Sequence, residues 1–164
     1  MNFDTQNRKL LIFTGTPSDS SKDFEYANFF KNFNGEKIIC GGSTASLISR
    51  ELNIPIKMSN NVMNIDGLPP SFVMDGVNLV TEGILTLSKA VEYLKSGLVT
   101  GIDNPAGKLV KFLIDNDFIC FVVGTKLNQS KINVINLKSR KEIIDEMVLI
   151  LQNKYSKKIS VQYI

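Results

Sequence analysis

The stretch IICGGSTASLISREL, residues 38–52, decides the fold class. A short apolar run ends in Gly41 and Gly42, and Ser43 and Thr44 then open a segment with apolar residues at helical spacing. A strand that leads through a tight corner into a helix is typical of a parallel sheet covered by helices. The same corner raises a question about function, because the two glycines either hold a negatively charged ligand or only let the chain turn.

The alternation of strand and helix continues on both sides of this stretch. Strands are predicted at residues 9–14, 36–40, 77–83, 118–124 and 159–164, and helices at residues 18–35, 43–52, 84–97, 104–117 and 140–158. Asn104 is the expected N-cap of the fourth helix, with Pro105 at its first position. The irregular middle, residues 53–76, predicts short extended segments and a long loop. We therefore predict one α/β domain over residues 1–164, with three layers: a mainly parallel sheet with helices on both faces.

The composition favours a cytoplasmic protein without a nucleic-acid or membrane partner. The net charge is only +3 and the lysines are spread along the chain, without the aromatic and basic pattern of nucleic-acid binders. The longest apolar runs are too short to cross a bilayer, and no secretory signal is evident. Cys40 and Cys120 each lie in an apolar run, which predicts buried, reduced thiols.

The absence of histidine limits the chemistry that the chain can perform. With no histidine and two isolated cysteines, the sequence offers no zinc site and no histidine-activated nucleophile. No pair of carboxylates has a spacing typical of metal binding or acid–base catalysis. We therefore assign no catalytic residue and no metal ligand.

Four predicted strands end in similar chemistry: TGTP, GGST, TEG and GTKLN. The carboxyl ends of parallel strands lie along one side of a sheet, where ligands bind in α/β proteins. Glycines let the backbone approach a ligand, and threonine and serine add hydroxyls, so we expect a small anionic or polyhydroxylic ligand. The predicted ligand-binding residues are Thr14, Gly15, Thr16, Gly41, Gly42, Ser43, Thr44, Thr81, Glu82, Gly83, Gly124, Thr125 and Asn128.

Each of these corners also has a purely structural explanation. Strand-to-helix turns use glycine for tight geometry and serine or threonine as N-caps, and the chain lacks both a phosphate-loop pattern and a complete GxGxxG. Glu82 could bind a hydroxyl or act as a base. The preferred interpretation places Glu82 in the first turn of a helix, where the helix dipole stabilises a carboxylate.

Several phrases together resemble a known family. KIICGGSTASLISREL, DGVNLVTEGILTLSKAVEYL, FVVGTKLN and NKYSKKISVQYI are similar to the C-terminal region of bacterial protein phosphatases related to the stage II sporulation protein E family. The resemblance covers residues 8–164, and GGST and LVTEGILTLSKA are its specific part. Relatives carry a histidine a few residues beyond the GTKxN phrase, whereas this chain has QSKIN at residues 129–133; Asn128 itself is retained.

The resemblance implies an accessory role rather than catalysis. In that family the phosphatase activity belongs to an N-terminal domain of the type 2C serine/threonine class, whose aspartates hold manganese or magnesium. The 164 residues contain no counterpart of that domain, so no cofactor is assigned to them. The expected partner is a phosphatase catalytic domain, in the same chain or in another, together with a small phosphorylated ligand.

Three functions remain open from the sequence. The leading one is a non-catalytic regulatory domain that binds a small ligand at its strand ends. The second is an interaction or dimerisation module in which the final helix and ISVQYI form the surface, which includes a homo-oligomer. The third is a small-molecule enzyme that uses Glu82 as its base.

Overall fold

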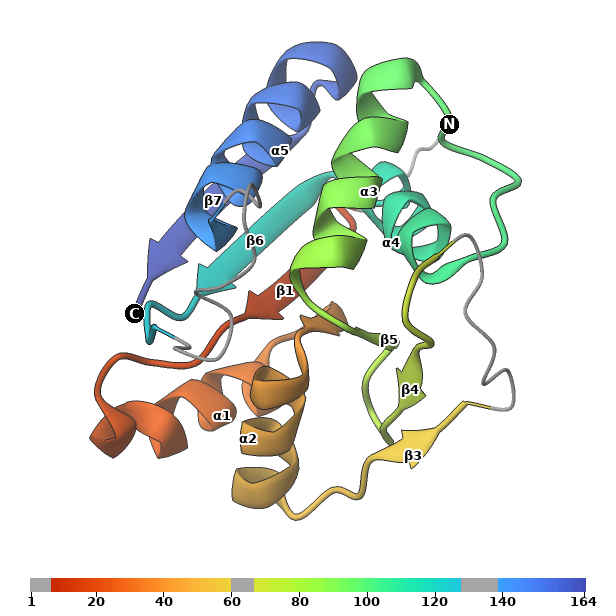
Figure 1. Cartoon of the computed structure of the whole chain (residues 1–164). Helices are drawn as coiled ribbons and strands as arrows, with labels where there is room; N and C mark the ends of the chain where they lie inside the picture. The colour runs from red at the N-terminus through yellow and green to blue at the C-terminus, as the bar shows by residue number, and fades with distance from the viewer. Residues whose placement is uncertain (1–6, 60–66, 128–138) are drawn as a thin grey trace, which may run out of the picture.

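The computed structural model describes residues 7–59, 67–127 and 139–164 (Figure 1). The strands of one central sheet alternate with helices along much of the chain. Their bounds are β1 Lys9–Thr14, the short 3₁₀ helix η1 Ser20–Lys22, α1 Asp23–Asn32, β2 Glu36–Cys40, α2 Gly42–Leu52, β3 Lys57–Met58, β4 Phe72–Val73, β5 Leu79–Thr81, α3 Ile84–Ser96, α4 Pro105–Asp115, β6 Phe118–Val123, α5 Arg140–Tyr155 and β7 Lys158–Tyr163.

The described strands form one sheet of seven, in the order β3-β4-β5-β2-β1-β6-β7. Five neighbouring strands, β5, β2, β1, β6 and β7, are parallel to one another. The two-residue strands β3 and β4 add an antiparallel margin beside β5. Helices cover both faces, so the structure confirms the predicted three-layer α/β class.

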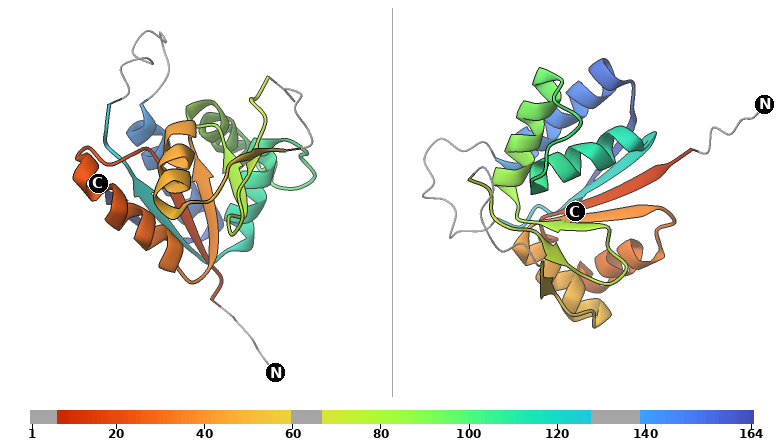
Figure 2. Two further views of the ribbon diagram at one scale, coloured as in Figure 1. Left: turned by 90° about the horizontal axis from the view of Figure 1, so that it is seen from below. Right: turned by 90° about the vertical axis from the view of Figure 1, so that its right-hand side faces the viewer.

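The helices divide into two groups, one for each face of the sheet (Figure 2). α1 and α2 lie on one face, and α3, α4 and α5 lie on the other. Side chains alternate along β1 to match: Leu10 and Ile12 pack into the core under α3, α4 and α5, whereas Leu11 and Phe13 pack under α1 and α2. The ring of Phe13 lies 4.3 Å from that of Tyr26, centroid to centroid. Because both faces are covered, the central strands are apolar throughout rather than alternating.

Local signals in the sequence position the helix ends. Asn104 caps α4 as predicted, since its side-chain oxygen accepts a hydrogen bond from the Gly107 amide at 2.8 Å, and Pro105 follows at the first position. Gly97 ends α3 with a positive φ of 78°, and the Leu98 amide then donates to the Tyr93 carbonyl at 2.9 Å. The candidate site lies at another helix end, the start of α2 directly after β2.

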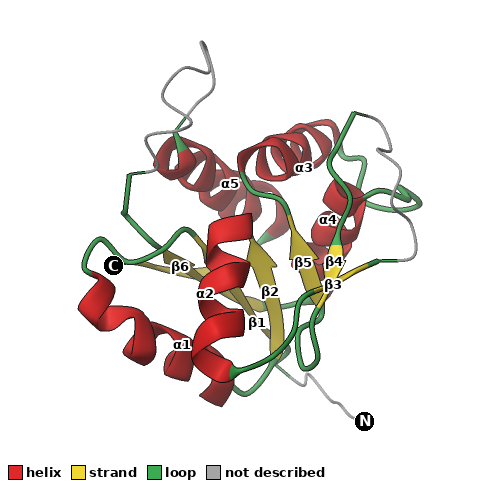
Figure 3. Cartoon of the chain, turned by 60° about the horizontal axis from the view of Figure 1, so that its bottom comes forward, coloured by secondary structure: helices red, strands yellow, loops and turns green. Residues whose placement is uncertain are grey.

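The order of the strands places the candidate site. From β1 the chain moves outward to β2 and β5, with α1 and α2 on one face, and it then crosses through α3 and α4 to β6 on the other side of β1. The strand order therefore reverses between β1 and β6. In open α/β sheets a crevice forms at such a reversal, beyond the carboxyl ends of the strands. Figure 3 shows α2 lying across these strands, next to α1.

Candidate ligand-binding site

A cavity of about 630 Å³ lies at the carboxyl ends of the strands, beside the start of α2. We call it the carboxyl-end cavity. Four of the predicted ligand-binding residues line it: Gly15 and Thr16 after β1, and Gly42 and Ser43 at the start of α2. The other lining residues are Pro17, Asp23, Ser46, Leu47, Arg50, Lys126, Leu127 and Arg140.

Two of the predicted glycines serve the packing of strand ends. A Cβ atom on Gly15 would lie 2.5 Å from the Gly124 carbonyl oxygen, and a Cβ on Gly124 would lie 2.2 Å from the Thr16 amide nitrogen. Such distances do not occur between real side-chain and backbone atoms. Gly15 and Gly124 therefore let the ends of β1 and β6 pack backbone against backbone, which is the structural explanation of these two corners.

The glycines at the β2–α2 corner have two different roles. Gly41 has a φ of 139°, a conformation that favours glycine, and it is buried. A Cβ on Gly42 would meet no atom within 4 Å, so the turn does not require glycine there. A Cβ on Gly83, at the end of β5, would lie 3.7 Å from the Gly41 Cα. The corners after β2 and β5 thus lie side by side, as expected for one common side of the sheet.

The start of α2 faces the carboxyl-end cavity without a side-chain cap. Gly41 is the N-cap and cannot supply a capping oxygen, while Gly42 and Ser43 both line the cavity. The first amide groups of a helix have no acceptor within the helix, and the helix dipole makes this end positive. This end of α2 therefore suits an anion.

Two buried threonine hydroxyls are used inside the protein. The Thr44 Oγ1 atom accepts a hydrogen bond from the Gly15 amide at 2.8 Å and donates to the Gly15 carbonyl at 3.1 Å. The Thr81 hydroxyl donates to the Glu82 carbonyl at 2.7 Å. The Tyr26 hydroxyl adds a second donor to the Gly15 carbonyl, at 2.5 Å. Thr44 and Tyr26 hold the corner after β1 in place, whereas the Thr81 bond lies at the end of β5, and neither threonine lines the cavity.

Arg140, the first residue of α5, reaches over the strand ends. Its Nε atom donates to the buried Thr14 hydroxyl at 3.1 Å. Its Nη1 and Nη2 atoms lie 3.1 and 4.0 Å from the positions that Cβ atoms would occupy on Gly15 and Gly83. The guanidinium therefore spans the corners after β1 and β5 and lines the carboxyl-end cavity.

The charge of Arg140 is half-buried. Burial lowers the pKa of the Arg140 guanidinium, and the charge of Glu82 is among those that act in the opposite direction. Among the residues that the structure describes, no carboxylate forms a salt bridge with Arg140. A cation that is removed from water without a directly bonded anion carries a desolvation cost that a bound anion would offset.

The other two cations at the cavity differ in their partners. Arg50 is bonded to Asp23 at 2.8 Å and to Glu51 at 2.9 Å, so its charge is neutralised within the protein. The Lys126 backbone is fixed by a hydrogen bond from its amide to the Thr16 carbonyl, at 3.0 Å. Within the described parts of the chain, the Lys126 ammonium forms no salt bridge. Arg140 and Lys126 therefore give the cavity an excess of positive charge.

The remaining predicted residues lie around the cavity rather than in its lining. Thr14, Gly41, Thr44, Thr81, Gly83 and Gly124 are buried behind it. The exposed Thr125 hydroxyl donates to the Ile164 carbonyl at 2.9 Å, and Asn128 lies outside the described residues. Glu82 is half-buried, and its expected place in the first turn of a helix is wrong: Gly83 is the N-cap of α3, so Glu82 precedes the helix.

Sequence reasoning missed the three cations, and one of them had a detectable signal. Arg140 and Lys141 open α5, where the positive end of the helix dipole disfavours cations. An arginine in that position has a local electrostatic cost, which indicates a role outside the helix. Lys126 lies within the quoted GTKLN phrase, but nothing in the sequence distinguishes it from other surface lysines.

The titratable groups near the cavity suit binding better than nucleophilic chemistry. Burial raises the pKa of the Cys40 thiol to about 12 and raises that of the Tyr26 hydroxyl above its usual range, so both stay protonated at neutral pH. Both cysteines are free; Cys40 is buried as predicted, whereas Cys120 is only half-buried because its side of β6 is incompletely covered. In residues 7–59, 67–127 and 139–164, no three histidine, cysteine, aspartate or glutamate side chains are grouped to hold a metal ion.

Comparison of the chain with protein-family models, with curated proteins and with solved structures finds no match. No helix within the described segments combines the length and apolar character needed to span a bilayer.

Proposed function

We propose that this domain binds a small phosphorylated ligand in the carboxyl-end cavity and that it is a non-catalytic, regulatory domain of a serine/threonine phosphatase. The first half of the proposal rests on the cavity. The second half rests on the resemblance of residues 8–164 to the C-terminal region of the sporulation-type phosphatases, whose manganese or magnesium would belong to the catalytic domain.

The half-buried Arg140 guanidinium is the observation that carries the binding proposal. It enters the cavity beside the uncapped start of α2, so a phosphate between them would receive hydrogen bonds from both. A guanidinium matches the planar arrangement of two phosphate oxygens and forms charge-assisted hydrogen bonds with them. Nε is already bonded to Thr14, and no bond from a described residue reaches either terminal nitrogen, so these two nitrogens would bind the ligand.

The rest of the cavity indicates a ligand larger than phosphate alone. Small-molecule sites commonly enclose about 300–1,000 Å³, and the carboxyl-end cavity falls in this range at about 630 Å³. Leu47, Leu127 and Pro17 supply apolar surface, and the Ser43 and Ser46 side chains supply hydroxyls. A phosphate ester of a sugar or nucleoside combines the required negative charge with hydroxyl groups and apolar faces.

Calorimetric titration with inorganic phosphate, sugar phosphates and nucleoside monophosphates tests the binding proposal. We expect at least one ester to bind more tightly than phosphate, and we expect Arg140→Met to weaken it by at least about tenfold, the loss of a charged hydrogen bond. Gly42→Val should weaken binding without unfolding the domain, because its Cβ points into open space. Arg8→Met, at the opposite end of the sheet, is the matched control and should bind normally. If no ester binds the wild-type chain, the binding proposal is wrong.

A separate experiment tests the regulatory proposal. A catalytic domain of the resembled phosphatase family, loaded with manganese, is assayed on a phosphorylated peptide with and without this chain. We expect the chain to change the turnover, and we expect the best phosphate ester to modulate that change. An unaltered turnover, together with no association by calorimetry, would contradict the assignment to a phosphatase while leaving the ligand site to its own test.

A further inference from the structure

The outer side of β7 is an unusually long open margin for this sheet. β7 runs for six residues, Lys158–Tyr163, and pairs with β6 along its whole length. Among the described strands, none pairs with its other side. The strand at the opposite margin of the sheet, β3, is only two residues long and includes Lys57, and both features disfavour the addition of another strand.

The hydrogen bonds to β6 determine which residues of β7 face outward. The Lys158 amide donates to the Asp117 carbonyl and the Ile164 amide donates to the Val123 carbonyl, each at 3.0 Å. In a parallel ladder every second residue of a strand bonds to the same neighbour, so the even-numbered residues of β7 bond to β6. The amide and carbonyl groups of Ile159, Val161 and Tyr163 therefore point away from the sheet.

β7 lacks the features by which proteins prevent strands from adding to a sheet margin. Such features include proline, bulges, charged side chains and very short strands. The sequence KISVQY contains one charge, Lys158 at its first position, and neither proline nor an acidic residue. All six residues keep their register with β6, which leaves no room for a bulge.

We propose that β7 is a dimerisation strand, which pairs antiparallel with β7 of a second copy of this chain and joins the two sheets into one. This goes beyond the proposed ligand binding and does not depend on it. With the two-fold axis at Val161, Val161 faces its own counterpart and Ile159 faces Tyr163 of the other copy. All three outward-facing residues then lie in hydrogen-bonded positions, for about six hydrogen bonds between the chains.

The side chains of β7 support a second copy as the partner. Ile159 and Val161 pack toward α5, and Tyr163 bonds to α5, so the paired residues share one face of the joined sheet. Antiparallel pairs of an aromatic with a β-branched residue, here Tyr163 with Ile159, stabilise a sheet by about 0.2–1 kcal/mol each. The strand is therefore complementary to itself in this register, and no other partner is needed to explain its pattern.

On the surface of α5 next to Tyr163, a cation and an anion neutralise each other. The Tyr163 hydroxyl donates to Asp145 at 2.8 Å, and the Lys141 ammonium bonds to the same carboxylate at 2.8 Å. Burial and the bond to Asp145 raise the pKa of Tyr163, so its hydroxyl remains a donor. On the same side of α5, Val148 follows Asp145 at helical spacing and is half-buried. Two such surfaces can approach each other across the two-fold axis without like-charge repulsion.

The mass of the whole chain in solution tests this proposal. Analytical ultracentrifugation at concentrations from about 1 to 200 μM should show a rise from 18.3 kDa to twice that mass. Val161→Pro removes the central outward amide and should abolish the dimer, since proline is tolerated where an edge strand faces outward. Val161→Ala removes two methyl groups, more apolar bulk than Val161→Pro, but keeps the amide, so it should retain most of the dimer. A wild-type chain that stays at 18.3 kDa throughout, or a folded Val161→Pro chain that still dimerises, would overturn the proposal.

Amide hydrogen exchange on the wild-type chain gives a test that requires no variant. The amides of Ser160 and Gln162 bond to β6 and should be protected at every concentration. The amides of Val161 and Tyr163 should exchange rapidly in dilute protein and at least about tenfold more slowly in concentrated protein. Rapid exchange of Val161 and Tyr163 at both concentrations would overturn the proposal, as would protection that does not depend on concentration.

Discussion

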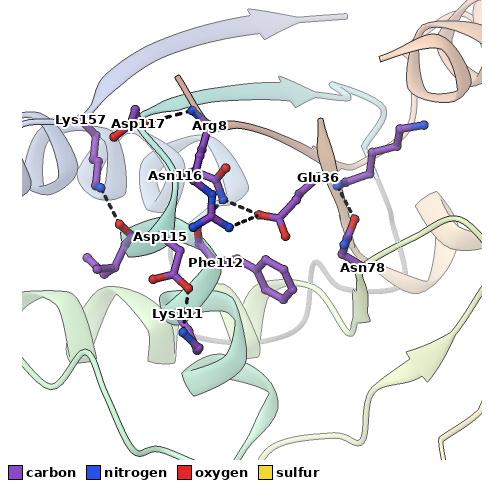
Figure 4. Close-up of polar contacts among 11 residues, drawn as sticks. Arg8, Glu36, Asn78, Lys111, Phe112, Asp115, Asn116, Asp117 and Lys157 are labelled. Atoms are coloured by element: carbon purple, nitrogen blue, oxygen red, sulfur yellow. Dashed lines mark hydrogen bonds and ion pairs between the residues drawn. The ribbon is translucent and has the colours of Figure 1, made fainter. Parts of the chain in front are cut away.

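The two ends of the parallel sheet differ in how their polar groups are hydrogen-bonded. At the amino end, where the parallel strands begin, the polar groups labelled in Figure 4 bond chiefly to one another, although the buried side-chain oxygen of Asn116 has no hydrogen-bond partner among the described residues. The backbone amide of Arg8 donates to an Asp117 carboxylate oxygen at 3.0 Å. The side-chain nitrogen of Asn116 donates to the Glu36 carboxylate at 2.9 Å and to the Phe112 carbonyl at 2.8 Å. At the carboxyl end, the one bond that the described residues form with the half-buried cation of Arg140 goes to a neutral hydroxyl, that of Thr14.

Other groups extend the network at the amino end. The Lys157 ammonium donates to the Ile114 carbonyl at 2.6 Å, and Lys111 pairs with Asp115 at 2.7 Å. The Lys37 amide donates to the Asn78 side chain at 2.8 Å. Charge alone therefore does not mark a binding site in this molecule. What distinguishes the carboxyl end is a partly desolvated charge, that of Arg140, to which the residues described by the structure offer one hydrogen bond and no carboxylate.

The largest effect is expected from forcing apart the strand ends that pack together at the carboxyl end. Gly124→Val would place a Cβ 2.2 Å from the Thr16 amide nitrogen, so β1 and β6 must separate. We expect the free energy of unfolding to fall by roughly 3 kcal/mol or more. Urea denaturation measures it, with Gly42→Val as the control that adds the same side chain where space is open. Equal stability of the two variants would refute the backbone-packing role of Gly124.

The next largest effect is a fall in the free energy of unfolding at alkaline pH, which also arises at the carboxyl end of the sheet. The pKa of Cys40 rises from an ordinary value of 9.0 to about 12 in the folded protein, so above pH 9 the unfolded chain loses this proton first. The stabilisation is complete below pH 9 and decreases as the pH rises toward 12, by roughly 1.4 kcal/mol per pH unit for one proton. Tyr26, whose pKa is also raised, adds a loss of the same sign at higher pH.

Denaturant unfolding at several pH values between 7 and 11 measures this slope. Cys40→Val should flatten the slope above pH 9, whatever its effect on stability at pH 7. Identical slopes for the variant and the wild type would show that Cys40 is not responsible.

A smaller effect is expected from the amino end. Asn116 is fully buried, and Asn116→Ala removes its bonds to Glu36 and to the Phe112 carbonyl. We expect a loss of about 1–3 kcal/mol in the free energy of unfolding, because buried polar groups lose their partner. Arg8→Met breaks only an exposed 3.7 Å ion pair with Glu36 and should cost less than about 1 kcal/mol. A larger loss from Arg8→Met than from Asn116→Ala would reverse the ranking of these contacts.

The smallest effect on stability is expected at the cation of the carboxyl end. Arg140→Met removes a charge that burial penalises and a single hydrogen bond to Thr14, so the two changes nearly cancel, to within about 1 kcal/mol without ligand. Thermal unfolding with and without the best phosphate ester measures both properties of the variant. We expect the melting temperature to be nearly unchanged, and its increase on adding ligand to be lost. A strong destabilisation without ligand would make Arg140 a structural residue of the fold.

Much of the fold could be predicted because its signals are local. The apolar run before Gly41, the Asn104–Pro105 start of α4 and the closing strand at the C-terminus each depend on a few neighbouring residues. The order of the strands could not be predicted, since it depends on contacts between β1 and residues more than 100 positions away.

The candidate site was predictable only in part, for a related reason. Glycines after β1, β2, β5 and β6 do come together, as parallel strands require. The sequence did not show, however, which threonine hydroxyls face the cavity and which bond inside the protein. Thr44 lies at a position where its hydroxyl meets the Gly15 backbone rather than the cavity. Arg140 bonds to Thr14 from 126 residues away, so the half-buried cation of the cavity depends on the folded arrangement.

The position of β6 between β1 and β7 has a consequence for how a ribosome delivers this protein. Arg8 and Asp117, which meet at the start of the β1–β6 pair, are 109 residues apart in the chain. The first strand must therefore remain half-paired while more than a hundred further residues are translated, and pairing across such separations is intrinsically slow. The nascent chain therefore exposes one side of β1 until β6 has been translated, and only then can this side of β1 pair.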